Sequence, residues 1–301
     1  MQFAGHETFA IREGWLHKGL KMVIEEPERW LDEDVADHLG VGRNMAKSIR
    51  HWLAATGLAE TSDKKVGKAQ LLEPTSIGKV VWESDPYFTH EGTWWALHIN
   101  LVNNTASAAT WTWFFNSFNA DRFDRALCVE TLKRHLELSR RRLPSLRTLE
   151  RDVACLLASY ARTIPQLSED PEEANDCPFI ELGILSHFKT SGYYQINQGI
   201  KGIPPEILGY ALALAFPSAR EGSGATDITI HDAARQANGP GKVFALTSET
   251  LFEVALAAEA QSSNIEIAGL AGSRVIRLKK SQPVAWIQAY YDIAERDRNA
   301  A

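Results

Sequence analysis

The chain has 301 residues, enough for two or three domains, and its 45% hydrophobic and 23% charged residues are ordinary for a globular protein. No apolar run reaches the roughly 18 residues that a membrane-spanning helix needs, and Glu7 and Arg12 interrupt the segment where a secretory signal would lie, which predicts a cytoplasmic protein. The formal net charge of −6 argues against a protein that coats nucleic acid without specificity, because phosphate contacts rely on lysine and arginine.

Basic residues are nevertheless concentrated in two stretches of the chain. Residues 41–70 contain six lysines and arginines against two acids, and residues 122–151 contain nine against four. The rest of the chain is therefore strongly acidic. This segregation is typical of a protein that has an acidic body and a cationic surface for nucleic acid.

The three cysteines, Cys128, Cys155 and Cys177, are few and widely spaced. Their number and spacing fit neither a disulfide framework nor a zinc site. We expect reduced thiols, with Cys128 and Cys155 buried as small apolar side chains.

The N-terminal elements are predicted from apolar spacing and turn residues. In chain order they are helices over 12–26, 33–39 and 42–56 and strands over 58–62 and 69–73. Asp32 is the expected N-cap of the second helix. Gly40, after that helix, suits a left-handed turn. A polar tip joins the two strands as a hairpin.

This order of elements is that of a winged helix-turn-helix. The short second helix, the glycine turn and the longer third helix form the helix-turn-helix, and the hairpin is the wing. Met45, Ile49 and Trp52 share one face of the third helix and are expected to be buried. In this fold the third helix lies in the major groove of a duplex, with its early residues nearest the base edges.

Polar residues on the third helix and the hairpin are the predicted DNA contacts. They are Arg43, Asn44, Lys47 and Arg50 on the helix and Lys64, Lys65 and Lys68 at the hairpin tip. The hydrogen-bonding pattern of Asn44 suits adenine, that of Arg43 suits guanine, and lysines suit phosphates. Two alternatives stay open: a basic helix face is usually only solvated, and some winged helices contact proteins alone.

The second basic stretch is also predicted to be helical. A charged helix covers 122–142, and Ser145 begins another over 146–160. Arg147 and Arg151 on this second helix could contact phosphates. The alternative is a charged helical hairpin that packs within the protein.

The predicted fold class is mainly α with small β elements: an N-terminal winged helix-turn-helix, a helical middle and an α+β C-terminal part. The C-terminal elements are helices over 205–215 and 249–260 and strands over 192–196 and 274–279. The predicted domains are a DNA-binding domain over 1–120, a basic helical region over 121–170 that could hold a second helix-turn-helix, and an α+β domain over 171–301 for partner docking.

Residues 3–9 are the candidate catalytic segment, with a glycine, a histidine, a glutamate and a threonine between phenylalanines. His6 and Glu7 could supply a general base and the group that orients it, and Arg12 could stabilise a phosphate. The alternative is a structural turn in which His6 and Glu7 cap the first helix or form hydrogen bonds with it. The sequence has no phosphate-binding loop, nucleophile elbow or paired zinc signature. A nuclease that uses Mg²⁺ or Mn²⁺ would need clustered carboxylates, which spacing alone cannot assemble.

Several motifs carry a resemblance to a known family. They are Phe3-Ala4-Gly5-His6-Glu7-Thr8-Phe9 with Arg12, Gly40-Val41-Gly42-Arg43-Asn44-Met45, Thr93-Trp94-Trp95-Ala96-Leu97-His98 and Asp176-Cys177-Pro178. On these the chain resembles the SspB-like family, found beside DNA phosphorothioation genes. The first two motifs are the more specific.

The resemblance implies a bacterial defence setting. It implies partnership with a cysteine desulfurase, a reductase-like sulfur-transfer protein and an ATPase, and single-strand nicking of double-stranded DNA. In a nickase, either a divalent metal such as Mg²⁺ or Mn²⁺ or the His6 and Glu7 pair would activate the attacking water. The family places no catalytic residue on this sequence. A non-catalytic DNA-binding adaptor or transcriptional regulator is the alternative.

Overall fold

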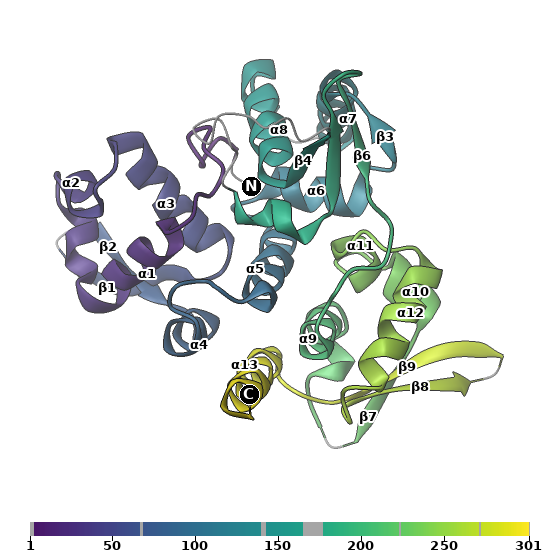
Figure 1. The fold of residues 1–301 in the computed structure, drawn as a ribbon. Helices are drawn as coiled ribbons and strands as arrows, with labels where there is room; N and C mark the ends of the chain where they lie inside the picture. Colours follow the sequence, from purple (N-terminus) through teal and green to yellow (C-terminus); the bar gives the residue numbers. More distant parts are fainter. Residues whose placement is uncertain are drawn as a thin grey trace. The chain divides into compact units, whose positions relative to one another are not determined.

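The computed structural model describes residues 3–66, 69–139, 143–164, 177–222, 224–270 and 272–300. The chain forms two compact units, one of residues 1–89 and 100–197 and one of residues 90–99 and 198–301. Helices dominate both units and small sheets complete them, as the sequence predicts (Figure 1). Within the described ranges, none of the helices combines the length and the apolar character needed to cross a bilayer.

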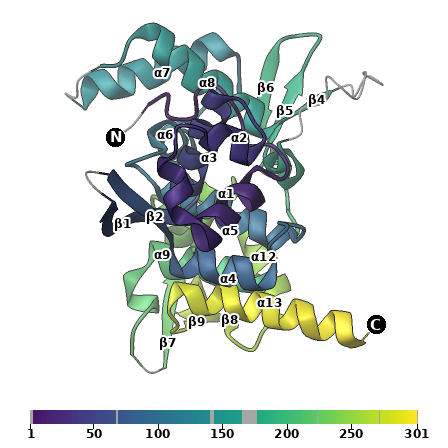
Figure 2. The same cartoon turned by 90° about the vertical axis from the view of Figure 1, so that its left-hand side faces the viewer.

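The first unit begins with helices and a hairpin. These elements are α1 (Trp15–Glu25), the 3-10 helix η1 (Pro27–Leu31), α2 (Val35–Leu39), α3 (Arg43–Ala55), β1 (Ala59–Val66), β2 (Ala69–Pro74) and α4 (Ser76–Ser84). β1 and β2 are antiparallel, with Ala59 opposite Pro74 and Val66 opposite Ala69. Figure 2 shows this hairpin beside α1. The predicted order of three helices and a hairpin is therefore present, with η1 and α4 added.

The turn between α2 and α3 forms as the sequence predicts. Gly40 has a φ of 64°, in the left-handed region that favours glycine, and the amide of Val41 donates to the Ala36 carbonyl. The predicted start of α2 is wrong. The helix begins at Val35, and Asp32 instead follows the end of η1, so its side chain does not cap α2.

The rest of the first unit combines helices with a four-stranded sheet. Its elements are the last residues of α5 (Glu91–Asn103), α6 (Ala109–Ser117), β3 (Arg122–Phe123), α7 (Arg125–Leu138), α8 (Leu146–Tyr160), β4 (Ala161–Ile164), η3 (Pro178–Leu182), β5 (Leu185–Phe188) and β6 (Tyr193–Ile196). The strand order is β3-β6-β5-β4, and the β4–β5 pair is parallel. Phe123, on β3, packs edge to face against Phe114 and Phe118, which stack on each other. The predicted domain boundaries at 120 and 170 both lie inside this unit.

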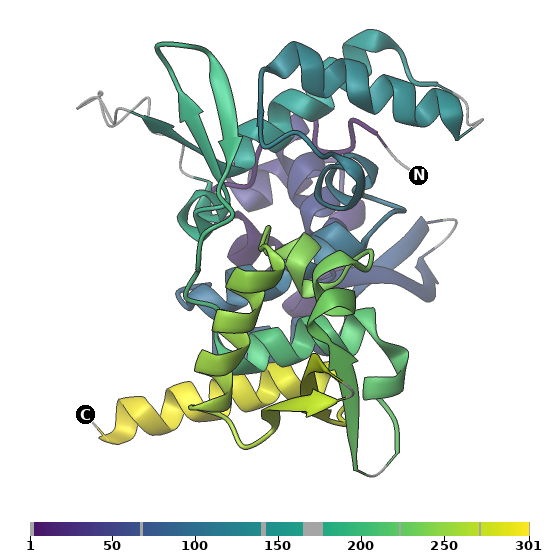
Figure 3. The ribbon, with the colours of Figure 1, turned by 90° about the vertical axis from the view of Figure 1, so that its right-hand side faces the viewer.

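The second unit packs helices against a three-stranded antiparallel sheet. Besides the first part of α5, its elements are α9 (Pro205–Ala215), η4 (Pro217–Ala219), β7 (Ala225–Thr229), α10 (Ile230–Arg235), α11 (Pro240–Val243), α12 (Ser248–Glu259), β8 (Ile265–Leu270), β9 (Ser273–Lys279) and α13 (Pro283–Ala300). The strand order is β7-β9-β8. Figure 3 shows α13 alongside α9. The two helices approach closely because Gly209 has no side chain: a Cβ there would lie 2.4 Å from Cε3 of Trp286.

All three cysteines are free, and Cys128 and Cys155 are buried, as predicted; Cys177 is buried as well. Burial raises the pKa of Cys128 and of Cys177 to about 12. These thiols are therefore not activated as nucleophiles or metal ligands.

Candidate nucleic-acid interface

The N-terminal segment folds into a tight turn around His6. Ala4, Glu7 and Thr8 have positive φ angles of 58°, 49° and 76°, each of which costs a non-glycine residue roughly 1 kcal/mol or more. The amide of Phe9 donates to the His6 carbonyl over 2.8 Å. Such a backbone persists where the surrounding contacts fix it.

Hydrogen bonds to buried groups fix this turn. The Thr8 amide donates to Nδ1 of His6 over 3.1 Å, so Nδ1 is the acceptor of the ring. Nε2 then carries the proton and donates to Oδ1 of Asp152 over 3.0 Å. His6 and Asp152 are both almost fully buried, 1% and 2% exposed. Both ring nitrogens of His6 are therefore occupied within the protein.

Asp152 joins three elements of the first unit. Its Oδ1 also accepts the Ala4 amide over 2.8 Å, and its Oδ2 accepts the hydroxyl of Thr110 on α6 over 3.0 Å. Ser48, on α3, donates its hydroxyl to the His6 carbonyl over 3.0 Å. The N-terminal turn thus ties α3, α6 and α8 together. Sequence reasoning offered Asp152 only as one of several available carboxylates and assigned it no partner, although it sits between the buried Leu149 and Leu156, where an acid is unusual.

The predicted catalytic residues lie in different surroundings. His6 is enclosed by the rings of Trp52 and Trp111, with centroids 6.1 and 5.7 Å away. Glu7 is half-buried, and Arg12 is exposed with its guanidinium over Trp15. No hydrogen bond or ion pair joins these three residues to one another in the described part of the chain. Their catalytic role stays a prediction. The enclosure of His6 favours a structural turn, but the turn is anchored to α8, and no side chain caps α1.

The predicted contact residues on α3 divide into two groups. Arg43, Asn44 and Lys47 are exposed in the first two turns of the helix, whereas Ile49 and Trp52 on the opposite face are fully buried. Arg50 differs, because its guanidinium carbon lies 5.9 Å from the centroid of the Trp30 ring. Burial lowers the pKa of Arg50. Arg50 thus packs against η1, whereas the other three side chains are open to solvent.

The remaining predicted DNA contacts lie on the hairpin and on α8. Lys64 and Lys65 are exposed on β1, and Lys68 lies outside the described residues. Arg147 and Arg151 are exposed one turn apart on α8. The Ser145 side chain caps that helix by accepting the Thr148 amide over 3.2 Å, as predicted for its start.

One side-chain cluster among the described residues brings three possible metal ligands within 4.8 Å of one another: Asp32, Asp34 and His38, all exposed. Oδ1 of Asp34 lies 3.4 Å from Nε2 of His38, and Arg29 lies 2.7 Å from its Nδ1. Mg²⁺ prefers oxygen ligands, and the arginine adds a positive charge beside the cluster. These residues do not fit a magnesium site, and we derive no step through a metal there.

Comparison with known proteins places the chain among relatives over nearly its whole length. The family model described as "Protein of unknown function (DUF4007)" matches residues 3–291. A magnesium ion-bound SspB crystal structure is similar with a TM-score of 0.83 and 28% sequence identity, covering 97% of this chain and 88% of that one. A second SspB crystal structure is similar with a TM-score of 0.82 and the same identity and coverage. No curated protein matches the chain.

Proposed function

The chain belongs to the DUF4007 family and is related to SspB, and from this premise we propose that it is a DNA-binding component of a bacterial DNA phosphorothioation system. We propose further that α1, α2, α3 and the β1–β2 hairpin act as a winged helix-turn-helix. The observation that carries the proposal is on α3, where Arg43, Asn44 and Lys47 are exposed on the early turns while the opposite face is buried. Early residues of the third helix are those that reach base edges in this fold.

The start of α3 favours a phosphate as well as bases. Gly42 precedes the helix, and no side chain caps its first turn. The first amide groups of the helix are therefore available to an anion, and the helix dipole adds partial positive charge at this end. Arg43, the first residue of α3, adds a full charge. Lys64 and Lys65 on β1 would contact the flanking backbone as the wing.

A second contact on α8 completes the proposed interface. Arg147 and Arg151 are exposed, while Asp152 on the same helix is held by the N-terminal turn. The turn also receives Ser48 of α3. The hydrogen bonds of Asp152 and Ser48 support a fixed spacing between the two basic helices, so a duplex would meet them together.

Strand nicking is the finer proposal, and the relationship to SspB supports it. Of the predicted catalytic residues, Glu7 and Arg12 reach solvent, whereas His6 is enclosed. We also propose that the protein acts together with a cysteine desulfurase, a sulfur-transfer protein and an ATPase. A Mg²⁺ or Mn²⁺ requirement is also proposed, without assigned ligands.

A non-catalytic adaptor is the second candidate. The observation that favours it is that the described residues hold no buried or half-buried group of three metal-ligating side chains, and the exposed group at Asp32 does not fit magnesium. An adaptor would bind DNA through the same surface and recruit its partners.

Supercoiled plasmid separates the two candidates. The purified full chain is incubated with plasmid and Mg²⁺ or Mn²⁺, with and without EDTA, and the open-circle form is quantified. Open circles that require metal support the nickase. Plasmid binding without open circles supports the adaptor, and absence of both binding and nicking contradicts the proposed function.

A further inference from the structure

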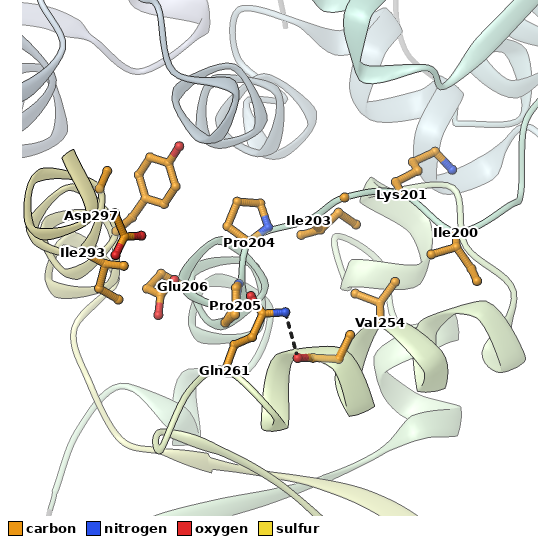
Figure 4. Close-up of a pocket in the computed structure, with 14 residues that line it drawn as sticks. Ile200, Lys201, Ile203, Pro204, Pro205, Glu206, Val254, Gln261, Ile293 and Asp297 are labelled. Carbon is orange, nitrogen blue, oxygen red and sulfur yellow. Dashed lines mark hydrogen bonds between the residues drawn. The ribbon is translucent and has the colours of Figure 1, made fainter. Parts of the chain in front are cut away.

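The second unit contains a pocket that the proposed function does not use. Its volume is about 680 Å³, in the range of small-molecule binding sites. It lies between α9, α12, α13 and the segment that precedes α9 (Figure 4). Apolar side chains make up most of the lining, among them Ile200, Ile203, Pro204, Val254 and Ile293.

Glu206 places a buried carboxylate in this lining. The residue is 5% exposed, and its carboxylate is bonded to its own backbone amide. No ion pair or side-chain hydrogen bond joins it to another residue in the described ranges. Burial raises its pKa. A buried acid without an oppositely charged partner is costly, and protein interiors normally supply one.

The other charged side chains of the pocket lie toward its two ends. Asp297, on α13, is exposed and lies at the same end of the pocket as Glu206 in Figure 4, whereas Lys201 lies toward the opposite end. The Lys201 ammonium donates to the carbonyl of Gly199 over 3.1 Å and to that of Ala245 over 3.4 Å. One end of the pocket is therefore acidic, the opposite end holds a lysine whose ammonium donates to backbone carbonyls, and most of the lining between them is apolar.

We propose that this pocket binds an aliphatic cation, whose ammonium or guanidinium group pairs with Glu206 and Asp297 while its alkyl stem lies on the isoleucines and prolines. The stem supplies apolar burial, and the charged head supplies the partner that Glu206 lacks. Such a group can come from a free alkylamine or from a lysine or arginine side chain of a partner. The proposal is independent of DNA binding, since every residue involved belongs to the second unit.

The test uses the full chain with ¹³C-labelled isoleucine methyl groups. n-Hexylamine, charged at pH 7, is titrated while methyl shifts are followed by NMR. We expect shifts at Ile200, Ile203 and Ile293 and none at Ile11 or Ile49, which are buried in the first unit. n-Hexanol, with the same stem and no charge, should bind about tenfold more weakly, the factor expected for one charged hydrogen bond.

A matched pair of variants isolates the carboxylate. Glu206→Gln keeps the shape and removes the charge, and we expect it to bind hexylamine about tenfold more weakly. Glu253→Gln removes an exposed acid of α12 outside the lining and should bind like the parent. Unchanged spectra at Ile265 and Ile276, which are buried in the second unit outside the lining, report that each variant is folded.

The outcomes decide the proposal and the source of the cation. Equal binding of hexanol and hexylamine, undiminished binding by Glu206→Gln, or shifts outside the three pocket isoleucines would overturn it. Nα-acetyl-lysine methylamide is the second probe: tighter binding than hexylamine supports a partner's side chain, and weaker binding supports a free amine. Glu206→Gln should bind plasmid like the parent, so failure here is distinguishable from failure of the proposed function.

Discussion

Nε2 of His6 and Oδ1 of Asp152 lie 3.0 Å apart although 146 residues separate them in the chain. The pair is buried, and the proton on Nε2 follows from the Thr8 amide on Nδ1. Asp152 therefore acts as the acceptor for three donors: the Ala4 amide, the His6 ring and the Thr110 hydroxyl. This arrangement predicts a stability role that substitution can measure.

Replacing Asp152 should destabilise the first unit according to how many donors lose their acceptor. Asp152→Ala leaves all three unsatisfied, and we expect a loss of roughly 3–5 kcal/mol in the free energy of unfolding. Asp152→Asn keeps one oxygen and should lose less. Denaturant titration measures both variants, and equal small losses would show that the buried pair is dispensable.

The exposed residues of α3 should determine DNA affinity. Arg43→Ala with Lys47→Ala is expected to weaken duplex binding by about 1–3 kcal/mol and to flatten its dependence on salt, because fewer counterions are released. Lys133→Ala is the control, since Lys133 is paired with Glu137 on α7. Fluorescence anisotropy at several salt concentrations measures both. Equal affinity of the double variant and the parent would remove α3 from the interface.

Arg50 should respond differently from its neighbours on α3. Its guanidinium lies over Trp30 and is half-buried, so Arg50→Ala is expected to lower the melting temperature, through lost packing, more than it lowers DNA affinity. The parallel measurements are thermal unfolding and anisotropy. A loss of affinity as large as that of the Arg43 and Lys47 double variant, at unchanged stability, would instead place Arg50 on the DNA.

His98 should make the second unit sensitive to acid. Burial lowers its pKa to about 4, and its Nε2 donates to the Val243 carbonyl over 2.8 Å. Because the unfolded chain binds this proton near pH 6.5, stability is lost as pH falls from 6.5 toward 4, by roughly 3 kcal/mol. His98→Gln keeps a donor without this titration. Its stability should therefore fall less than the parent's over that window, and parallel curves would contradict the assignment.

Glu206 should cost the protein stability at neutral pH. Its pKa is raised by burial, so the stability that the protonated acid contributes below the ordinary carboxyl pKa is lost as pH rises through the raised value. Glu206→Gln avoids that loss and should melt at a higher temperature than the parent at pH 7. The gap should close as the pH is lowered. A lower melting temperature for the variant at pH 7 would show that the carboxylate is already satisfied.

The first unit shows what sequence could predict. Apolar spacing places α1, α3 and the hairpin within a few residues of their observed bounds, because each has one strongly apolar face or a polar tip between strands. Gly40 is equally clear. The position of Asp32 could not be predicted, because it follows the 3-10 helix η1, which apolar spacing does not reveal.

The interior contacts could not be predicted in the same way. The partner of His6 lies on a helix 146 residues away, and no local pattern links the two. Arg50 shares a periodicity with Arg43 and Lys47, but the position of Trp30 separates it from them. Glu206 reads as an ordinary acid at a helix start, and the pocket that buries it forms from segments far apart in the chain.

The split of α5 has a practical consequence for dissecting this protein. Residues 90–99 belong to the second unit, where Trp95 packs edge to face on Phe244 and His98 bonds to Val243. A fragment cut after Asn197 would therefore keep these two side chains but lose the surface that covers them. The indole ring of Trp95 would be exposed to water in this fragment and would promote aggregation. Deletion mapping would then report a folding defect, so roles within this chain are better assigned one side chain at a time.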